Sequence, residues 1–174
     1  MAKELPEIPE ADDAFQKRVA LSIAIMAVIL SFIGNRGDNA KTDAIIKTNE
    51  ASNKWGYFQA KSIKGQMSRM EGELLQNLSG ETPSEKSAKL IEKLKADSER
   101  YDSEKAEIKT EAEHLVSEAQ QQSETNDKCD RASLFLQIGV VICSVAILSG
   151  WKPFWLIGVG LGIAGTIIGA GVLF

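Results

Sequence analysis

The segregation of charged residues is the feature that most constrains this chain. Residues 19–34 carry no charged side chain and residues 132–174 carry only Lys152, whereas residues 35–131 hold most of the charge. About 20 consecutive apolar residues are enough for a helix to cross the hydrocarbon core of a bilayer. A chain with its apolar residues gathered in this way has few left to build a soluble core. The pattern therefore predicts an integral membrane protein.

Three apolar segments are predicted to be transmembrane helices: residues 17–34, 132–150 and 154–174. The first is short, and reaches a spanning length only if Lys17 and Arg18 extend their side chains toward the membrane surface. The sequence WKP at 151–153 separates the other two. Trp151 and Lys152 of this sequence, and Trp155 just after it, suit the membrane interface. Pro153 suits the first turn of a helix. The last two segments are therefore predicted to form a tight transmembrane hairpin.

The sequence GLGIAG at 160–165 matches the dinucleotide-binding pattern G-x-G-x-x-G. That site needs a preceding strand, a helix that begins within the pattern and an acidic residue about 20 positions later. Here the pattern lies inside an apolar run and no acidic residue follows. Small residues spaced 4-3-4 share one helix face and let helices approach closely in lipid. The predicted helix-packing residues are Gly158, Gly162, Gly165 and Gly169, with Gly139, Cys143, Ala146 and Gly150 in the second segment and Ala20, Ala24, Ala27, Ser31 and Gly34 in the first. The alternative is that alanine and glycine are simply common in membrane helices.

The charged middle, residues 35–131, is predicted to be a soluble antiparallel helical hairpin inserted between the first two membrane helices. Its turn falls near residues 79–84, where Gly80 suits a helix end, Pro83 a helix start, and Thr82 or Ser84 a cap. The sequence GNRGDN at 34–39 predicts a hinge ahead of the hairpin.

Opposite charges repeat every seven residues on the two hairpin helices. The first helix carries Lys47, Lys54 and Lys61, and the second carries Asp97, Glu104, Glu111 and Glu118. Folding the chain at residues 79–84 brings the lysines opposite the acids, and such pairing would set the register of the hairpin. Each exposed pair contributes only about 0–1 kcal/mol, and the alternative is two independently solvated faces.

A narrow apolar seam accompanies these charges. Leu94, Tyr101, Ile108 and Leu115 recur every seven residues, interleaved with Ser98, Lys105, Ala112 and Ala119, as in a coiled coil. On the first helix Trp55 and Phe58 share a face, and Ile63, Met67, Met70 and Leu74 follow a 4-3-4 spacing. The residues predicted to form the hairpin core or a partner surface are Trp55, Phe58, Tyr101, Ile108 and Leu115.

The sequence lacks the chemical groups that several classes of protein require. Cys129 and Cys143 form no C-x-x-C pattern, and the only histidine, His114, lies in a polar helical stretch. No catalytic, metal or cofactor-binding residue is predicted. The net charge of −4 gives no reason to expect nucleic acid, and no small-molecule substrate is evident. The membrane segments contain no ionisable residue of the kind that marks an ion path, which argues against a transporter.

We therefore expect a non-enzymatic membrane scaffold or interaction subunit that self-associates through its small-residue helix faces. Its hairpin would present a coiled-coil-like surface to a partner. The expected partners are the lipid bilayer and either further copies of the chain or another membrane protein. The alternative is a pore-forming or accessory channel or transporter subunit. Residues 1–16 are predicted to be a disordered acidic tail.

The order of these parts resembles a family of small bacterial membrane proteins grouped as domain of unknown function 4337. WGYFQAKSIK at 55–64 is similar to the family's aromatic-Gln-Ala-Lys segment, and ERYDSEKAEIK at 99–109 resembles its second signature. One N-terminal and two C-terminal membrane segments match as well. The resemblance implies this architecture, and brings no activity, cofactor or catalytic residue. A bacterial cytoplasmic (inner) membrane is then expected, and Lys17 and Arg18 slightly favour a cytoplasmic N-terminus with a periplasmic hairpin.

Overall fold

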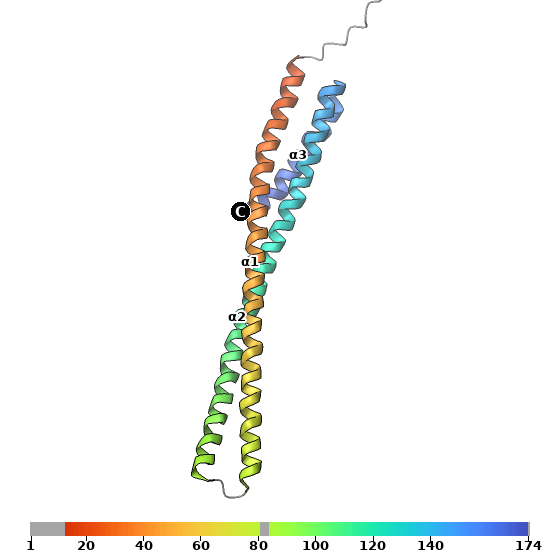
Figure 1. Cartoon of the computed structure of the whole chain (residues 1–174). Coiled ribbons are helices and arrows are strands. Elements are labelled where there is room, and N and C mark those ends of the chain that lie inside the picture. Colours follow the sequence, from red (N-terminus) through yellow and green to blue (C-terminus); the bar gives the residue numbers. More distant parts are fainter. Residues whose placement is uncertain (1–12, 81–83, 174) are drawn as a thin grey trace, which may run out of the picture. The chain divides into compact units, whose positions relative to one another are not determined.

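The computed structural model describes residues 13–80 and 84–173, and almost all of them lie in three helices (Figure 1). Helix α1 spans Asp13–Ser79, α2 spans Glu85–Ser149 and α3 spans Lys152–Leu173. Each helix contains a stretch long and apolar enough to cross a membrane. The prediction of an all-helical protein with three helices able to span a bilayer is confirmed, because the described ranges contain no strand.

Two glycines end the long helices. Gly80 follows α1 with φ of 61° and Gly150 follows α2 with φ of 63°, both in the left-handed region that glycine adopts without strain. Helix α2 begins after Ser84, whose Oγ accepts a hydrogen bond from the backbone N–H of Ser87 at 3.2 Å. Ser84 is therefore the cap of α2. The other two residues predicted for this turn, Thr82 and Pro83, lie outside the described ranges.

Two predicted boundaries are wrong. The hinge at residues 34–39 is absent, because these residues are helical within α1. A Cβ at Gly37 would lie 2.9 Å from the Cβ of Cys129 on α2, so this glycine serves the close approach of two helices and not a bend. The predicted disordered tail is too long, because α1 already begins at Asp13 and Phe15 is buried. The rest of that tail, residues 1–12, lies outside the described ranges.

The described residues divide into two compact units. The three-helix unit contains residues 13–42 of α1, residues 122–149 of α2 and α3. The two-helix unit contains the remaining parts of α1 and α2, residues 43–121 apart from the turn residues that are not described. Each unit has its own packing, and each is described separately below.

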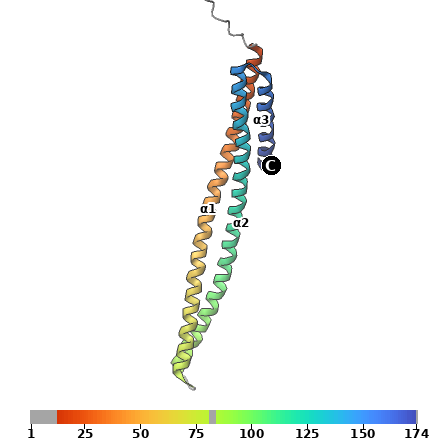
Figure 2. The same ribbon diagram turned by 90° about the vertical axis from the view of Figure 1, so that its right-hand side faces the viewer.

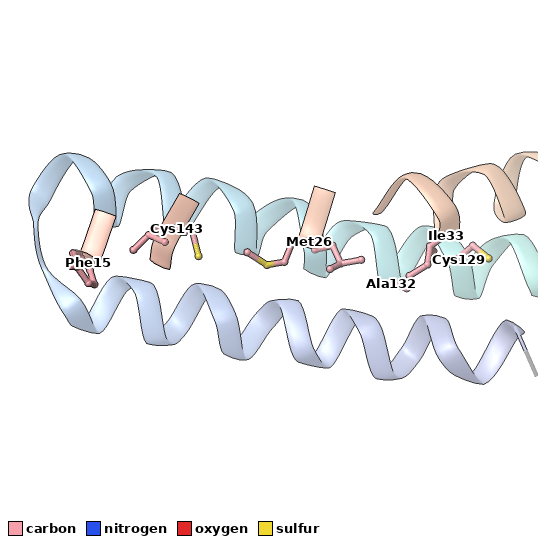
Figure 3. Packing of buried hydrophobic residues seen from close by; sticks show 8 residues of the cluster. Phe15, Met26, Ile33, Cys129, Ala132 and Cys143 are labelled. Atoms are coloured by element: carbon pink, nitrogen blue, oxygen red, sulfur yellow. The ribbon is translucent and has the colours of Figure 1, made fainter. Parts of the chain in front are cut away.

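The core of the three-helix unit is a narrow column of side chains along the helices, part of which Figure 3 shows. Val19, Leu136, Cys143 and Ala146 are fully buried, together with Ala132. The outer surface of this unit is also apolar. Large side chains that are at least half exposed include Leu21, Ile25, Val28 and Phe32 on α1, Val141 on α2, and Leu156 and Ile167 on α3.

The two-helix unit pairs the C-terminal part of α1 with the N-terminal part of α2, side by side in both views (Figures 1 and 2). Its most buried positions carry mainly small residues: Ala51, Gly65 and Gly72 on α1, and Ser98, Ala112 and Ala119 on α2. Small side chains let two helices pack closely. This seam leaves several larger apolar residues of α1 exposed, among them Met67 and Met70.

Candidate interaction surfaces

The glycine face of α3 packs against the backbone of α2. A Cβ at Gly158 would lie 2.8 Å from the carbonyl oxygen of Gly139 and 2.5 Å from Sγ of Cys143. A Cβ at Gly165 would lie 2.8 Å from the carbonyl oxygen of Ala132. Backbone atoms cannot move aside as a side-chain end can. These two glycines are therefore required for the observed contact between α3 and α2.

The other two glycines of that face meet α1. A Cβ at Gly162 would overlap the side chain of Met26, and one at Gly169 would overlap that of Ile33. All four predicted glycines thus face helices of the same chain. By contrast, a Cβ at Gly160 or Gly171 would meet nothing within 4 Å.

The small residues predicted as a packing face on α1 lie elsewhere. Ala20, Ala24, Ala27 and Ser31 are all exposed within the three-helix unit. The α1 residues that fill its core are instead larger, namely Val19, Met26 and Ile33. None of the described helices packs against the small-residue face of α1.

The aromatic residues around the α2–α3 connection divide into two kinds. Trp155 packs edge-to-face against Phe15, with ring centroids 6.0 Å apart, and its Nε1–H donates a hydrogen bond to Oγ of Ser22 at 3.2 Å. This tryptophan therefore joins α3 to α1. Trp151 is 56% exposed and packs edge-to-face against Phe154, with ring centroids 4.7 Å apart. This exposed position suits the membrane interface expected for it.

Three ion pairs join α1 and α2 in the two-helix unit. Lys47 bonds Glu118 at 2.6 Å, Lys54 bonds Glu111, and Lys61 bonds Glu104. The residue numbers of the partners rise along α1 as they fall along α2. These are three of the pairs expected from the seven-residue repeats. The fourth acid, Asp97, bonds Arg100 of its own helix, because position 68 of α1 carries a serine.

The ion pairs shift the pKa values of their members. A hydrogen bond from Lys61 lowers the pKa of the Glu104 carboxyl, and one from Lys47 lowers that of Glu118. The pKa of Lys47 is raised in turn by its hydrogen bond to Glu118. The carboxyl of Asp102 has a lowered pKa because Lys105 and then Arg69 stabilise its charge. Pairing therefore favours the charged form of each group.

The predicted aromatic and apolar residues of the two-helix unit are half-buried. Trp55 and Phe58 contact each other edge-to-face with centroids 5.4 Å apart. Tyr101 has the Lys61 ammonium 5.2 Å from its ring centroid and the Arg100 guanidinium 5.1 Å away. Such cations over an aromatic face add a modest attraction. Ile108 and Leu115 lie along the same side of α2.

Sequence reasoning missed the α1 side of this seam. Gly65 and Gly72 are buried. A Cβ added at Gly65 would lie 3.4 Å from the Cβ of Tyr101, and one at Gly72 would lie 3.6 Å from the Cβ of Leu94. Ala51 is 2% exposed and lies two heptads before Gly65. The available signal was the seven-residue repeat of small residues, which a search for large apolar residues overlooks. The stripe of Ile63, Met67, Met70 and Leu74, which does follow helical spacing, is exposed.

Among the described residues no three His, Cys, Asp or Glu side chains are grouped so that they could hold a metal ion. His114 is 71% exposed, with Nδ1 3.9 Å from a Glu118 oxygen. Cys129 and Cys143 are both free thiols and both buried.

Comparison with known proteins gives one match. Neither the curated proteins nor the solved structures contain a match to the chain. The family model "Domain of unknown function (DUF4337)" matches residues 15–174, which is nearly the whole chain and includes all three helices. The chain therefore belongs to the DUF4337 family, as the resemblance of its segments 55–64 and 99–109 indicated.

Proposed function

We propose that this chain is a non-enzymatic integral membrane scaffold or interaction subunit. Its three-helix unit is the membrane anchor, and its two-helix unit is a soluble helical hairpin that presents a surface to a partner. The observation that carries the proposal is the contrast between the apolar outer surface of the first unit and the ion-paired surface of the second.

The outer surface of the three-helix unit supports a position in lipid. Side chains such as Phe32, 69% exposed, and Ile167, 68% exposed, would form an unusually large apolar patch in water. In a bilayer the same side chains face lipid tails at no cost. The exposed face of Ala20, Ala24, Ala27 and Ser31 is then available for close contact with a helix of another molecule.

Hydroxyl groups in the three-helix unit favour a scaffold over a pore. Ser22, Ser144 and Thr166 each donate a hydrogen bond to a carbonyl oxygen one turn earlier in their own helix, at 2.8–3.0 Å. These hydroxyls are satisfied locally and do not converge on a polar path. The charges at Lys17 and Arg18 support a cytoplasmic N-terminus and a periplasmic hairpin in a bacterial inner membrane.

The mass of the gently solubilised native complex tests this proposal, with bound detergent accounted for. A discrete oligomer, or one copy bound to other proteins, is the result expected of an interaction subunit. A lone monomer under conditions that preserve helicity would contradict the proposal. Parallel measurement of ion flux in vesicles would show whether an oligomer also conducts, which the proposal does not expect.

A further inference from the structure

The α1 helix of the two-helix unit has one face without any charged residue. At successive spacings of 3 and 4 residues this uncharged face consists of Ile46, Asn49, Asn53, Gly56, Ala60, Ile63, Met67, Met70, Leu74 and Asn77. All ten residues are exposed. The spacing is that of the a and d positions of a coiled coil. Charged residues flank the face, with Glu50, Lys64 and Glu71 on one side and Glu73 on the other.

The face lies away from α2. Residues Ala51, Gly65 and Gly72 are buried against α2 or beside it, and a helix turns about 100° per residue. Met67 is therefore on roughly the opposite side of α1 from both Gly65 and Gly72. The packing of this unit accounts for one seam of α1 and leaves a second, coiled-coil-like seam without a partner among residues 13–80 and 84–173.

Gly56 supplies an independent observation. Glycine inside a helix lowers stability relative to alanine, so it calls for a reason. At Gly65 and Gly72 the reason is contact with α2, but a Cβ at Gly56 would meet nothing within 4 Å. With Ala60 one turn later, Gly56 forms a small-residue step on the uncharged face. Such a step lets another helix backbone approach closely.

We infer that the uncharged face of α1 binds the same face of a second copy of this chain, as a parallel pair of helices. This inference rests on the proposed function and names the partner of the hairpin. A two-fold axis along the helices would place each residue of the face opposite its own counterpart.

The polar residues of the face are complementary to themselves. An asparagine amide both donates and accepts hydrogen bonds, so Asn49 and Asn53 can each pair with the identical side chain of a second copy. A buried asparagine in a coiled coil fixes register and the number of strands. Four successive residues of the uncharged face would supply the apolar contact: Ile63, Met67, Met70 and Leu74.

The flanking charges are compatible with parallel pairing. In a parallel coiled coil each g residue meets the e residue five positions later on the partner helix. The resulting pairs bring no two like charges together: Ile45 with Glu50, Ser52 with Tyr57, Gln59 with Lys64, Gln66 with Glu71, and Glu73 with Leu78. Anchoring two copies in one bilayer would hold them in the same direction and raise their effective concentration.

Disulfide cross-linking of the full chain in membranes tests the geometry. An Ile63→Cys variant would place two thiols opposite each other in the proposed pair, and mild oxidation should give a covalent dimer. The matched control is Ser103→Cys, an exposed position on the side of α2 that faces away from α1. Wild-type chain, with its two buried cysteines, gives the background. Equal cross-linking of the Ser103→Cys control, or none at Ile63→Cys, would overturn the inference.

The mass of the native complex tests whether the uncharged face holds the two copies together. Replacing Met67 and Met70 with lysine puts like charges into the proposed interface at two exposed positions, so the fold of the single chain should survive, as its helicity would show. We expect the complex to lose at least half of its mass. Lysine at Ser103 and Ser117, which are exposed on α2, adds the same charge elsewhere and should leave the mass unchanged. An unchanged mass in the Met67→Lys, Met70→Lys variant would count against the inference.

The wild-type mass separates failure of the inference from failure of the proposed function. A homo-oligomer that survives the lysine substitutions, or a single copy bound to another protein, would overturn the inference and leave the interaction subunit standing. A lone wild-type monomer in native membranes, without an Ile63→Cys cross-link, would overturn both.

Discussion

The two units of this protein both bring helices close together through small residues, yet the atoms that meet are different. In the three-helix unit, glycines of α3 rest on carbonyl oxygens of α2, as Gly165 does on Ala132. In the two-helix unit, a Cβ added at Gly72 would lie 3.6 Å from the Cβ of Leu94, an ordinary contact distance, and ion pairs border the seam. In the membrane position proposed for the first unit, lipid gives helices no hydrophobic drive to associate, so shape fit must supply the contact. In water, the environment proposed for the second unit, apolar burial and charge pairing can contribute as well.

A substitution on the glycine face should have the largest effect. Gly165→Leu would push a side chain into the Ala132 carbonyl and the Leu136 backbone N, 2.8 and 3.1 Å from the new Cβ. We expect a loss of about 3 kcal/mol or more, because overpacking against backbone cannot relax by rotamer changes. Thermal unfolding in lipid nanodiscs, followed by helicity, measures this. Gly160→Leu, at an open position, should melt like wild type, and a shared shift in both variants would contradict the account.

Overpacking the two-helix seam should have the next largest effect. Ala112 is fully buried, and Ala112→Leu should cost about 1–3 kcal/mol because the helices must separate locally. The expected loss of stability is smaller than for Gly165→Leu, because side chains as well as backbone line this seam. Hydrogen exchange of residues 43–121 measures the change. The matched control is Ala106→Leu on the exposed side of α2, and equal exchange in the two variants would speak against a close-packed seam.

Acidification should weaken the two-helix unit selectively. The lowered pKa values of Asp102, Glu104 and Glu118 mean that these carboxylates stabilise the pairing above their ordinary pKa of about 4. That contribution is lost as the pH falls through the lowered values. The raised pKa of Lys47 gives the opposite sign, so its contribution is lost only as the pH rises through that raised pKa.

The stability of the two-helix unit should therefore be greatest between those limits. A pH series of thermal melts, read by a fluorescent probe on Ser103→Cys, measures this. Melting that does not change between neutral and acid pH would show that the ion pairs do not contribute.

A single reversed pair should have the smallest effect. Glu111→Lys would face Lys54 with a like charge, and because both side chains are substantially exposed we expect a Tm shift of at most about 4 °C. Adding Lys54→Glu restores an opposite-charge pair and should recover most of the loss. The recovery should shrink in high salt, because exposed charges are screened. A double variant no more stable than Glu111→Lys would show that the two residues do not interact.

The sequence predicted the helices, one register and the α2 side of the two-helix seam, but not its α1 side. Three apolar segments were long enough to predict helices able to cross a membrane. Seven-residue repeats of lysine and glutamate matched Lys47 with Glu118 because identical spacing leaves few registers. The α1 side of the hairpin seam was missed, because Ala51, Gly65 and Gly72 give no hydrophobic signal. Gly37 was mistaken for a hinge, because glycine that bends a helix and glycine that admits a neighbouring helix look alike in a sequence.

The glycine face of α3 shows a second limit of prediction from sequence. Its 4-3-4 spacing identified a face of α3 but not what the face meets, since contacts within one chain and between chains require the same small residues. Only the structure places Gly162 against Met26 and Gly169 against Ile33 of α1.

The contrast between the two units depends on one claim, that exposed apolar residues of the first face lipid while the second lies in water. Reaction of single cysteines with a water-soluble maleimide, on membrane vesicles opened to reagent on both sides, tests it most directly. Val28→Cys, at a position 57% exposed on the three-helix unit, should not react until detergent is added, whereas Ser103→Cys should react at once. Reaction of Val28→Cys in intact bilayers at the rate of Ser103→Cys would contradict the account.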